Sequence, residues 1–405
     1  MRVLLVGSGG REHALAWSLT RCPSLGDLHA APGNPGIAEL AECHSVAADD
    51  LPGLAGLARR LRANLVVVGP EGPLVAGLGD ELLAGEIATF GPSAAAARIE
   101  GSKRFAKDVM RSAGVRTALT LPEPNAPCVV KFDGLASGKG VFVCRTEAEL
   151  ERGLAAASRL GDEVVVEALL EGEELSLFGL CDGRDVLPLA PARDFKRAFD
   201  GDTGPNTGGM GSYSPVPGIG QTEVDELVDA VHRPVLRELA ARGTPFKGLL
   251  YAGLMLTDEG PRVLEFNCRF GDPEAQSVLP RLDGDVLEAL TAAAAGDLGA
   301  TRLNAHGAAV TVVLAADTYP EAGDAGTPIG GLDEAQATGA LVFHAGTTLR
   351  DGKPATSGGR VLDVTGAGET LDEARRSAYA GAAAVVCPTL RYRSDIAAEV
   401  AAVRS

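Results

Sequence analysis

Short apolar runs that end in glycine-rich turns organise the first hundred residues. Residues 3–6 (VLLV) and 65–68 (LVVV) are continuous runs of Val and Leu, which is typical of strands buried on both faces of a parallel sheet. A helical pattern follows the first run over residues 11–19, and a further strand is predicted at 87–90. The pattern predicts a small doubly wound α/β domain over residues 1–100. In such sheets, ligands bind at the carboxyl ends of the strands.

The middle of the chain combines strands with long or glycine-rich connections. Residues 128–143 predict a strand, a loop of small residues and a second strand, and residues 164–167 predict a strand that ends in an acid. Residues 193–215 predict a long irregular loop with apolar anchors, which in a compact domain indicates an ordered functional segment. Residues 248–257 and 262–267 predict a hairpin. Helices are predicted at residues 94–110, with an interruption at 101–103, and at 222–241 and 283–296.

The last hundred residues are rich in Ala and Gly. Strands predicted at 308–315, 341–344 and 360–364 alternate with turns, and a closing helix is predicted at 371–386. We therefore expect a small C-terminal α+β domain. The predicted fold class is α/β and α+β multidomain, with domains at residues 1–100, 101–304 and 305–405.

The composition is that of a folded protein with several domains. The chain has 405 residues, of which 45% are hydrophobic, and a formal net charge of -17. This length allows two to four domains with their own cores, and the apolar share excludes a disordered chain. A negative surface repels phosphates, so no nucleic acid partner is expected. An anionic substrate must therefore enter a locally basic pocket.

Cysteine usage and the lack of long apolar runs indicate the cellular compartment of the protein. The 7 cysteines include no CxxC pair, which favours buried thiols in a reducing compartment over disulfides or a zinc site. The first apolar run is too short for a signal peptide, and none reaches the roughly 18 residues of a membrane span. We expect a cytoplasmic protein with small-molecule substrates and no membrane partner, as a monomer or weak homodimer.

Lysine is rare in this chain and is concentrated near glycine-rich motifs. Most of the 37 basic residues are arginines, yet five lysines lie in or beside such motifs. A swinging ammonium suits a phosphate group that moves, whereas chance placement is the alternative. These lysines are Lys103, Lys107, Lys131, Lys139 and Lys196.

Two glycine-rich loops are candidate phosphate sites. Residues 7–10 (GSGG) precede a helix whose N-terminus can hold an anion. Glu12 stands where GxGxxG needs its third glycine, which favours a single phosphate or sugar phosphate over a nicotinamide cofactor. Residues 134–140 (GLASGKG) do not fit a P-loop and lie between strands, so we expect a hairpin lid over nucleotide phosphates. A structural turn and a plain hairpin are the respective alternatives.

A dense polar stretch at residues 264–274 (LEFNCRFGDPE) is the strongest candidate for chemistry. Glu265 and Asn267 alternate along a predicted strand, so their oxygens point to one side and can hold Mg²⁺ against nucleotide phosphates. Arg269 lies on that side too if the strand continues. The alternative is a solvated strand end followed by a turn.

Ten motifs follow one another in order over nearly the whole chain. They are GSGGREHALAW at 7–17, PGNPG at 32–36, GPEGPLV at 69–75, EGSKRFAKD at 100–108, DGLASGKGV at 133–141, LEGEELS at 170–176, DFKRAFDGDTGPNTGGMGSYSP at 194–215, LEFNCRFGDPEAQ at 264–276, FHAGT at 343–347 and TSGGRVL at 356–362. Together they resemble the phosphoribosylamine–glycine ligase (glycinamide ribonucleotide synthetase) family of the ATP-grasp superfamily. Ten ordered motifs that cover nearly the whole chain are highly specific.

The resemblance implies a central ATP-grasp domain with a mobile lid at about residues 120–188. It implies ATP as cosubstrate, Mg²⁺ or Mn²⁺ as metal, and ligation of glycine to 5-phosphoribosylamine. ATP would phosphorylate the glycine carboxylate, and the amine would attack the resulting glycyl phosphate. The products would be glycinamide ribonucleotide, ADP and phosphate, in de novo purine biosynthesis.

The resemblance also implies roles for single residues. Glu265 and Asn267 would be metal ligands, and Arg269 would stabilise charge at the reacting carboxylate. Further catalytic residues would be Lys139 and Asp194. Nucleotide contacts would come from Lys103, Lys131 and Lys139, from Glu167, Leu169 and Leu170 at the adenine hinge, and from Glu174 or Glu173 at the ribose. Substrate contacts would come from Gly9, Gly10, Arg11, Asn34, Glu71, Asp194, Lys196, Asp202, Thr207 and Arg269.

Some alternatives stay open at this point. Residues 251–253 carry no acid where many ATP-grasp enzymes have a second metal-binding carboxylate, so the ligands of a second metal are not assigned. An ATP-grasp ligase for another acid and amine, and a nucleotide-binding regulatory protein without turnover, are rival functions. The intact Glu265 and Asn267 count against the regulatory protein, and Glu12 counts against a nicotinamide-dependent dehydrogenase.

Overall fold

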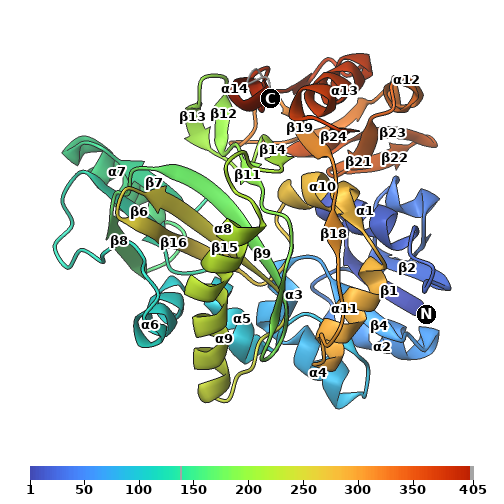
Figure 1. Ribbon diagram of the computed structural model, residues 1–405. Coiled ribbons are helices and arrows are strands. Elements are labelled where there is room, and N and C mark those ends of the chain that lie inside the picture. Colours follow the sequence, from blue (N-terminus) through green and yellow to red (C-terminus); the bar gives the residue numbers. More distant parts are fainter. Residues whose placement is uncertain (137–138, 402–405) are drawn as a thin grey trace.

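The N-terminal domain of the computed structural model is a five-stranded parallel sheet, and the structure describes residues 1–136 and 139–401 (Figure 1). The strand order is β3-β2-β1-β4-β5. Leu4 and Val6 belong to one hydrophobic core, whereas Val3 and Leu5 belong to another, so both faces of β1 are covered. The predicted doubly wound fold is confirmed. The strands are β1 (Arg2–Gly7), β2 (Asp27–Pro32), β3 (Glu42–Cys43), β4 (Leu65–Val68) and β5 (Thr89–Phe90), and the helices are α1 (Gly10–Leu19), η1 (Ile37–Glu39), α2 (Leu51–Leu61), α3 (Glu71–Ala76) and α4 (Leu78–Ala84).

A small three-stranded antiparallel sheet stands out on one side of the molecule, at the left of Figure 1. It consists of β6 (Cys128–Phe132), β7 (Val141–Cys144) and β8 (Val164–Ala168), and α7 (Glu147–Ala157) packs on it. This unit, which we call the lid sheet, has a separate hydrophobic core around Val130. A unit with its own core is suited to move as one body.

Another sheet in the middle of the chain carries the start of the dense polar stretch at residues 264–274. Its order is β10-β9-β15-β16, and all its pairs are antiparallel. The predicted hairpin is confirmed as β15 (Lys247–Thr257) and β16 (Gly260–Asn267). The remaining strands, β9 (Glu173–Asp182) and β10 (Val186–Pro188), lie in this sheet and not in the lid sheet, although they fall within the residues assigned to the lid.

The prediction of one helix over residues 222–241 is wrong. The structure has α8 (Gln221–Ala230) and α9 (His232–Ala241), with Val231 between them at φ -121° and ψ -64°. Pro234 provides the physical reason, because proline has no N–H to donate to the carbonyl group of Ala230. The helix predicted at 283–296 is confirmed as α11 (Val286–Ala295), which Asp285 caps.

The prediction of an irregular loop over residues 193–215 is also wrong. The segment contains four short strands, and β14 pairs with β19 of the C-terminal domain. Strands of two to four residues are too short to show a period, which explains why the sequence pattern did not reveal them. The strands are β11 (Arg193–Asp194), β12 (Arg197–Phe199), β13 (Thr203–Asn206) and β14 (Gly211–Ser214).

The C-terminal part forms a sheet of order β11-β14-β19-β24-β21, with β25 paired to β19. The long helix α13 (Leu371–Ala384) packs against β24 and β19. This α+β arrangement agrees with the predicted fold class. The strands are β19 (Ala308–Ala316), β20 (Asp324–Pro328), β21 (Leu341–His344), β22 (Thr347–Arg350), β23 (Lys353–Gly358), β24 (Arg360–Gly368) and β25 (Leu390–Arg391). The other elements are α5 (Ala94–Gly101), α6 (Lys103–Ala113), α10 (Glu274–Val278), η2 (Leu279–Arg281), β17 (Leu282–Asp283), β18 (Asn304–Ala305), α12 (Leu332–Ala337) and α14 (Ala398–Ala401).

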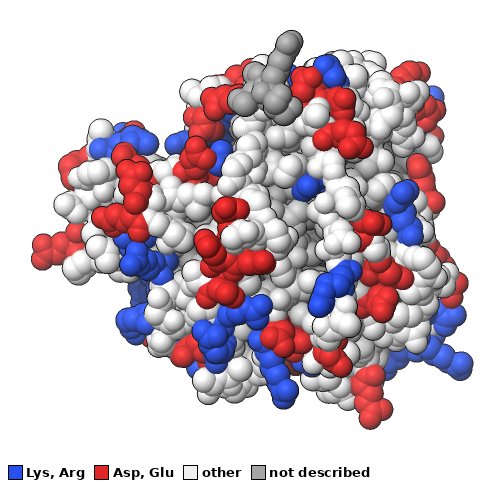
Figure 2. Space-filling model, viewed as in Figure 1, with Lys and Arg blue, Asp and Glu red and all other residues white. Residues whose placement is uncertain are grey.

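Surface charge is mixed in sign over the visible face. Figure 2 shows acidic and basic side chains interspersed on this face, in a chain with 54 acidic and 37 basic residues. Within the described part of the chain, every helix is too short or too polar to cross a membrane.

Candidate active site

One large cavity, of about 1180 Å³, lies where the three parts of the chain meet. Arg11 and Glu71 reach it from the N-terminal domain, and Arg360 reaches it from the C-terminal domain. Lys131 and Glu167 line it from the lid sheet. Most of the predicted site residues therefore meet here. Those that line the cavity are Arg11, Glu71, Lys103, Lys131, Glu167, Leu169, Leu170, Glu174, Asp194, Lys196, Asp202, Thr207, Glu265, Asn267 and Arg269.

The end of β16 supplies a carboxylate and an amide to the cavity. Glu265 and Asn267 lie opposite Gly253 and Tyr251 of β15. Burial alone would raise the pKa of Glu265, but the ammonium groups of Lys196 and Lys131 hold it below its ordinary value. An ionised carboxylate beside an amide oxygen is a donor pair that Mg²⁺ and Mn²⁺ accept.

Further acids gather beside Glu265, and we call Asp194, Glu174, Lys196 and Glu265 the Asp194 cluster. Burial, together with repulsion from Glu274, Glu174 and Glu265, raises the pKa of Asp194 to about 8, although Lys196 acts in the opposite direction. Lys196 Nζ lies 2.6 Å from Glu174 Oε2. The cluster carries more negative than positive charge, so a divalent cation beside Glu265 would relieve the repulsion. The residues present thus fit a metal ion.

Glu274 was not assigned from the sequence, yet it belongs to this region. Its carboxylate is buried and accepts a hydrogen bond of 2.8 Å from the Tyr251 hydroxyl group. The neighbouring strand has no acid at this point, but α10 brings one to the same place. The motif at residues 264–274 contained this acid, although only the fold could show that it turns back toward β15.

Glu167 holds two lysines at the edge of the lid sheet, and we call these residues the Glu167 cluster. Its Oε1 lies 2.9 Å from Lys107 Nζ, and its Oε2 lies 2.8 Å from Lys131 Nζ. Lys131 also donates to the carbonyl group of Leu264, next to Glu265. The Glu167 side chain is thus occupied by lysines, so an adenine contact at this residue would use its backbone. Lys107 had no assigned role, although it lies one helical turn after Lys103 on α6.

Lys103 connects the start of α6 with the loop that follows β6. Its Nζ donates to the carbonyl group of Gly134 at 2.7 Å, and its backbone N–H donates to Asp133 Oδ1 at 2.6 Å. Lys139 is exposed and is not part of the cavity wall. The predicted lid loop at 134–140 includes residues 137 and 138, which lie outside the described residues, and the role of Lys139 stays a prediction.

Arg269 lies between two carboxylates, one of which the sequence did not reveal. Its guanidinium group is 3.1 Å from Glu71 Oε2 and 3.0 Å from Glu100 Oε1. Burial would raise the pKa of Glu71, but Arg269 and Arg11 hold it at about 2. Glu100 also accepts from the backbone N–H of Cys268 at 2.7 Å, which fixes α5 against the end of β16. Arg269 is therefore held rigidly in the cavity wall.

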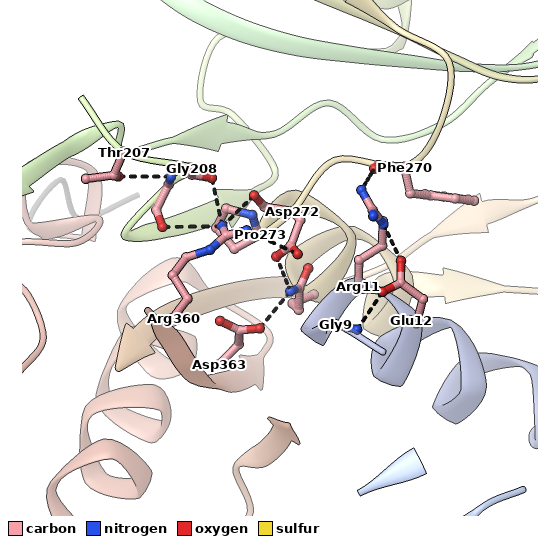
Figure 3. Close-up of polar contacts among 12 residues, drawn as sticks. Gly9, Arg11, Glu12, Thr207, Gly208, Phe270, Asp272, Pro273, Arg360 and Asp363 are labelled. Atoms are coloured by element: carbon pink, nitrogen blue, oxygen red, sulfur yellow. Dashed lines mark hydrogen bonds and ion pairs between the residues drawn. The ribbon is translucent and has the colours of Figure 1, made fainter. Parts of the chain in front are cut away.

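In the glycine-rich loop at residues 7–10, a carboxylate of the protein itself lies where an anion was predicted to bind, and the anion role of this loop stays a prediction. Glu12 Oε2 accepts from the Gly9 N–H, and Glu12 Oε1 accepts from Arg11 Nε, both at 2.6 Å (Figure 3). The protein's own carboxylate thus caps the start of α1, and neither Gly9 nor Gly10 lines the cavity. A Cβ atom at Gly10 would overlap Asp363 Oδ2, so this glycine allows close packing between domains.

Asn34 and Glu173 also lie away from the cavity wall. The Asn34 amide donates to the carbonyl groups of Ser8 and His344, at 2.9 and 2.7 Å, and therefore connects two domains. Glu173 is exposed and pairs with Arg193 at 2.6 Å, whereas Glu174 faces the cavity.

The C-terminal domain closes the cavity through Arg360, which belongs to the TSGGRVL motif at residues 356–362. Its NH1 donates to the carbonyl groups of Gly208 and Asp272, each at 2.7 Å, and its NH2 lies 3.2 Å from Asp272 Oδ2 (Figure 3). Thr207, next to this contact, donates from Oγ1 to the carbonyl group of Lys196 at 2.8 Å. Asp202 lies 3.3 Å from Arg393 and is largely exposed. The substrate roles of Thr207 and Asp202 stay predictions.

A lid sheet beside a strand with a carboxylate and an amide, and lysines between them, defines an ATP-dependent ligase of the ATP-grasp class. Residues 1–100, 101–275 and 309–399 match the N, ATP-grasp (A) and C domains of phosphoribosylglycinamide synthetase. The chain belongs to the phosphoribosylglycinamide synthetase family.

Individual relatives agree with this assignment over the full chain. It is 52% identical to a phosphoribosylamine–glycine ligase of Streptomyces coelicolor, over 99% of this chain and 100% of that protein. It is 48% identical to the Rhizobium meliloti ligase, over 98% of each chain. The crystal structure of the Thermotoga maritima ligase matches with a TM-score of 0.84 and 34% identity, over 98% of this chain and 100% of that chain.

A more distant structure shares the fold alone. The biotin carboxylase domain of Hydrogenobacter thermophilus 2-oxoglutarate carboxylase, in complex with MgADP and bicarbonate, matches with a TM-score of 0.70 and 16% identity. The match covers 96% of this chain and 91% of that chain.

Proposed function

We propose that the chain joins glycine to 5-phosphoribosylamine at the cost of ATP, through glycyl phosphate. Family membership supports the reaction, and one observation supports its place in the molecule. The metal-ligand pair Glu265 and Asn267, the phosphate-binding candidates Lys103 and Lys131, and Arg269 all line one cavity. These are the groups that phosphoryl transfer to a carboxylate requires.

In the first step, a glycine carboxylate oxygen forms a bond to the γ-phosphorus while the bond to the ADP oxygen breaks. Lys131 and Lys103 hold the phosphate oxygens and balance their charge, because little covalent chemistry falls to the protein in such a transfer. A divalent metal ion, when bound, supplies further positive charge to the phosphates. Glu265 and Asn267 are its proposed ligands.

In the second step, the amine nitrogen attacks the acyl carbon, and the bond from carbon to the phosphate oxygen breaks. The nitrogen gives up one proton, which we assign to Asp194, and inorganic phosphate leaves. Arg269 faces the cavity and stabilises the negative oxygen that develops on the acyl carbon. Its clamp between Glu71 and Glu100 keeps this charge in position without reorganisation.

ATP is proposed to lie between the lid sheet and β16. Backbone groups of residues 167–170 contact the adenine, and Glu174 accepts from the ribose hydroxyl groups. Arg11, Glu71, Lys196, Asp202 and Thr207 are the proposed contacts to glycine and the sugar phosphate. Lys139 is proposed to reach the phosphates from the lid.

The proposal extends to the metal, the cellular location, the oligomeric state and the domain bounds. Mg²⁺ and Mn²⁺ are both compatible with oxygen ligands. We propose a cytoplasmic monomer or weak homodimer that acts on small molecules, without nucleic acid or membrane partners. We also propose domains at residues 1–100, 101–304 and 305–405, with the lid within 120–188.

The test is ADP release from Mg-ATP with glycine, with and without phosphoribosylamine formed in place from ribose 5-phosphate and ammonia. The expected result is equal amounts of ADP and amide, formed only when both substrates are present. Amide formation with another acid or amine, at a higher kcat/KM, would contradict the proposed substrates. ATP binding without turnover on any pair would favour the regulatory alternative.

A further inference from the structure

A second cluster of ligating side chains lies at the outer edge of the N-terminal sheet. His29 is on β2, Glu42 is on the edge strand β3, and His44 follows β3 directly. One ligand atom from each of these residues lies within 4.8 Å of the others. We call these three residues the His29 cluster. They are not part of the active-site cavity wall.

Strand pairing explains why the three side chains meet. His29 is the register partner of Glu42 in the parallel pair β2–β3, and the His44 N–H donates to the carbonyl group of Ala30 at 2.8 Å. Glu42 and His44 are two residues apart, so they project on the same side of the extended chain. Cys43 projects to the other side, where a Cβ atom at Gly33 would overlap its Sγ.

The spacing of the ligand atoms is that of a metal coordination sphere. His29 Nδ1 and His44 Nε2 form a hydrogen bond of 3.1 Å, which binding of an ion by both nitrogens would replace. Glu42 Oε2 lies 3.5 Å from His29 Nδ1, and Glu42 Oε1 lies 3.9 Å from His44 Nε2. Two nitrogens that each bind Zn²⁺ at about 2.0–2.1 Å with a tetrahedral angle are about 3.3 Å apart. Little movement is therefore needed to bring these atoms around one ion.

Access and ligand chemistry favour a transition metal. The His29 side chain is 11% exposed and the His44 side chain 19%, whereas the Glu42 side chain is 69% exposed. An ion can therefore enter from solvent and keep a water molecule as a further ligand. Two imidazole nitrogens select zinc-type ions over Mg²⁺, which prefers oxygen ligands.

We propose that His29, Glu42 and His44 form a site for a divalent transition metal ion, separate from the metal ligands at Glu265 and Asn267. Two imidazole nitrogens, one carboxylate oxygen and water would bind the ion. Because β3 has only two residues, it has few ladder hydrogen bonds to β2. The bound ion would therefore fasten the edge strand to the sheet.

The test is Co²⁺ binding to the untagged full chain, stripped of metal and then saturated with Mg²⁺, followed by calorimetry and absorption. We expect one high-affinity Co²⁺ ion with a visible spectrum of a nitrogen and oxygen site. His44→Gln and Glu42→Gln should each lower the affinity for this ion by more than about tenfold. His306→Gln is the matched control, because His306 is exposed at 71% and lies outside the cluster.

Two further measurements keep the outcome clear. Zn²⁺ should raise the melting temperature of the wild type and of Glu265→Gln, but not that of His44→Gln. Ligase turnover should be unchanged in His44→Gln and Glu42→Gln, which shows that both fold. Unchanged Co²⁺ affinity in these variants, or a thiolate-to-cobalt charge-transfer band in the wild type, would overturn the proposal.

Discussion

The Asp194 cluster and the Glu167 cluster lie side by side in the cavity, yet they carry opposite excess charge. Three carboxyl groups share one ammonium group in the first, whereas two ammonium groups share one carboxylate in the second. They meet at β16, where Lys131 donates to the carbonyl group of Leu264, beside Glu265. The first is suited to receive a cation and the second to receive phosphates. A metal ion bound to a nucleotide would therefore balance the excess negative charge of the first cluster and the excess positive charge of the second.

The largest expected effect is the loss of turnover when Glu265, a proposed metal ligand, is replaced. Glu265→Gln keeps the size of the side chain but removes its charge, so kcat should fall at least about a hundredfold, or about 3 kcal/mol, at saturating Mg²⁺. Steady-state turnover and circular dichroism measure activity and fold. Glu259→Gln is the control, since Glu259 is 78% exposed on the same hairpin. Wild-type turnover of Glu265→Gln would remove Glu265 from the metal site.

The next largest effect is the loss of stability when Glu167, which pairs with two lysines, is replaced. Glu167→Gln leaves two ammonium groups close together without their carboxylate, which should cost about 2 kcal/mol of stability. Thermal unfolding should show a lower melting temperature, and saturating ATP should recover part of it because the triphosphate supplies negative charge. Glu163→Gln, 63% exposed just before β8, should change little. No recovery with ATP would contradict the assignment of Lys131 to phosphates.

A third prediction concerns a buried acid that does not line the cavity. Asp363 and Gln276 each have an oxygen without a hydrogen-bond partner within residues 1–136 and 139–401. Burial and the charge of Asp272 raise the pKa of Asp363 to about 7. The folded protein therefore binds this proton more tightly than the unfolded chain, so stability is lost as pH rises from about 4 through about 7.

Asp363→Asn removes this titration. The melting temperature of the variant relative to wild type should rise between pH 5 and pH 8, by the equivalent of about 2–3 kcal/mol. The amide can also donate to the Gln276 oxygen that lacks a partner. Asp351→Asn is the control, because Asp351 is exposed in the same domain. A difference between variant and wild type that does not depend on pH would contradict the raised pKa.

The smallest effect distinguishes two neighbouring acids. Glu174→Gln should raise KM for ATP about fivefold, or about 1 kcal/mol, with little change in kcat, because a ribose contact binds without taking part in the chemistry. Glu173→Gln should leave both constants unchanged, since its side chain is 72% exposed and outside the cavity wall. The reverse result would assign the ribose to Glu173.

The elements with a clear hydrophobic period were predictable from the sequence. The hairpin of β15 and β16 is one example. The strand β1 was predictable too, because its continuous run of Val and Leu indicates burial on both faces. The strands β11 to β14 were not, since two to four residues show no period. The break at Val231 depended on Pro234, which a helical pattern alone does not reveal.

The candidate site was predictable where chemistry is encoded along one strand, as at Glu265 and Asn267. It was not predictable where the fold joins distant elements. Glu100 faces Arg269 only because α5 packs against the end of β16. Asn34 lies in a motif rich in turn residues, and the motif cannot tell whether its amide binds substrate or the backbone of another domain.

The most direct test of the account follows one oxygen atom. Glycine labelled with ¹⁸O in its carboxylate is turned over with Mg-ATP and phosphoribosylamine, and the inorganic phosphate is analysed by mass spectrometry. An acyl phosphate requires the bond between carbon and the bridging oxygen to break, so we predict one ¹⁸O atom in each phosphate released. Unlabelled phosphate, together with full amide formation, would contradict activation of the glycine carboxylate in this cavity.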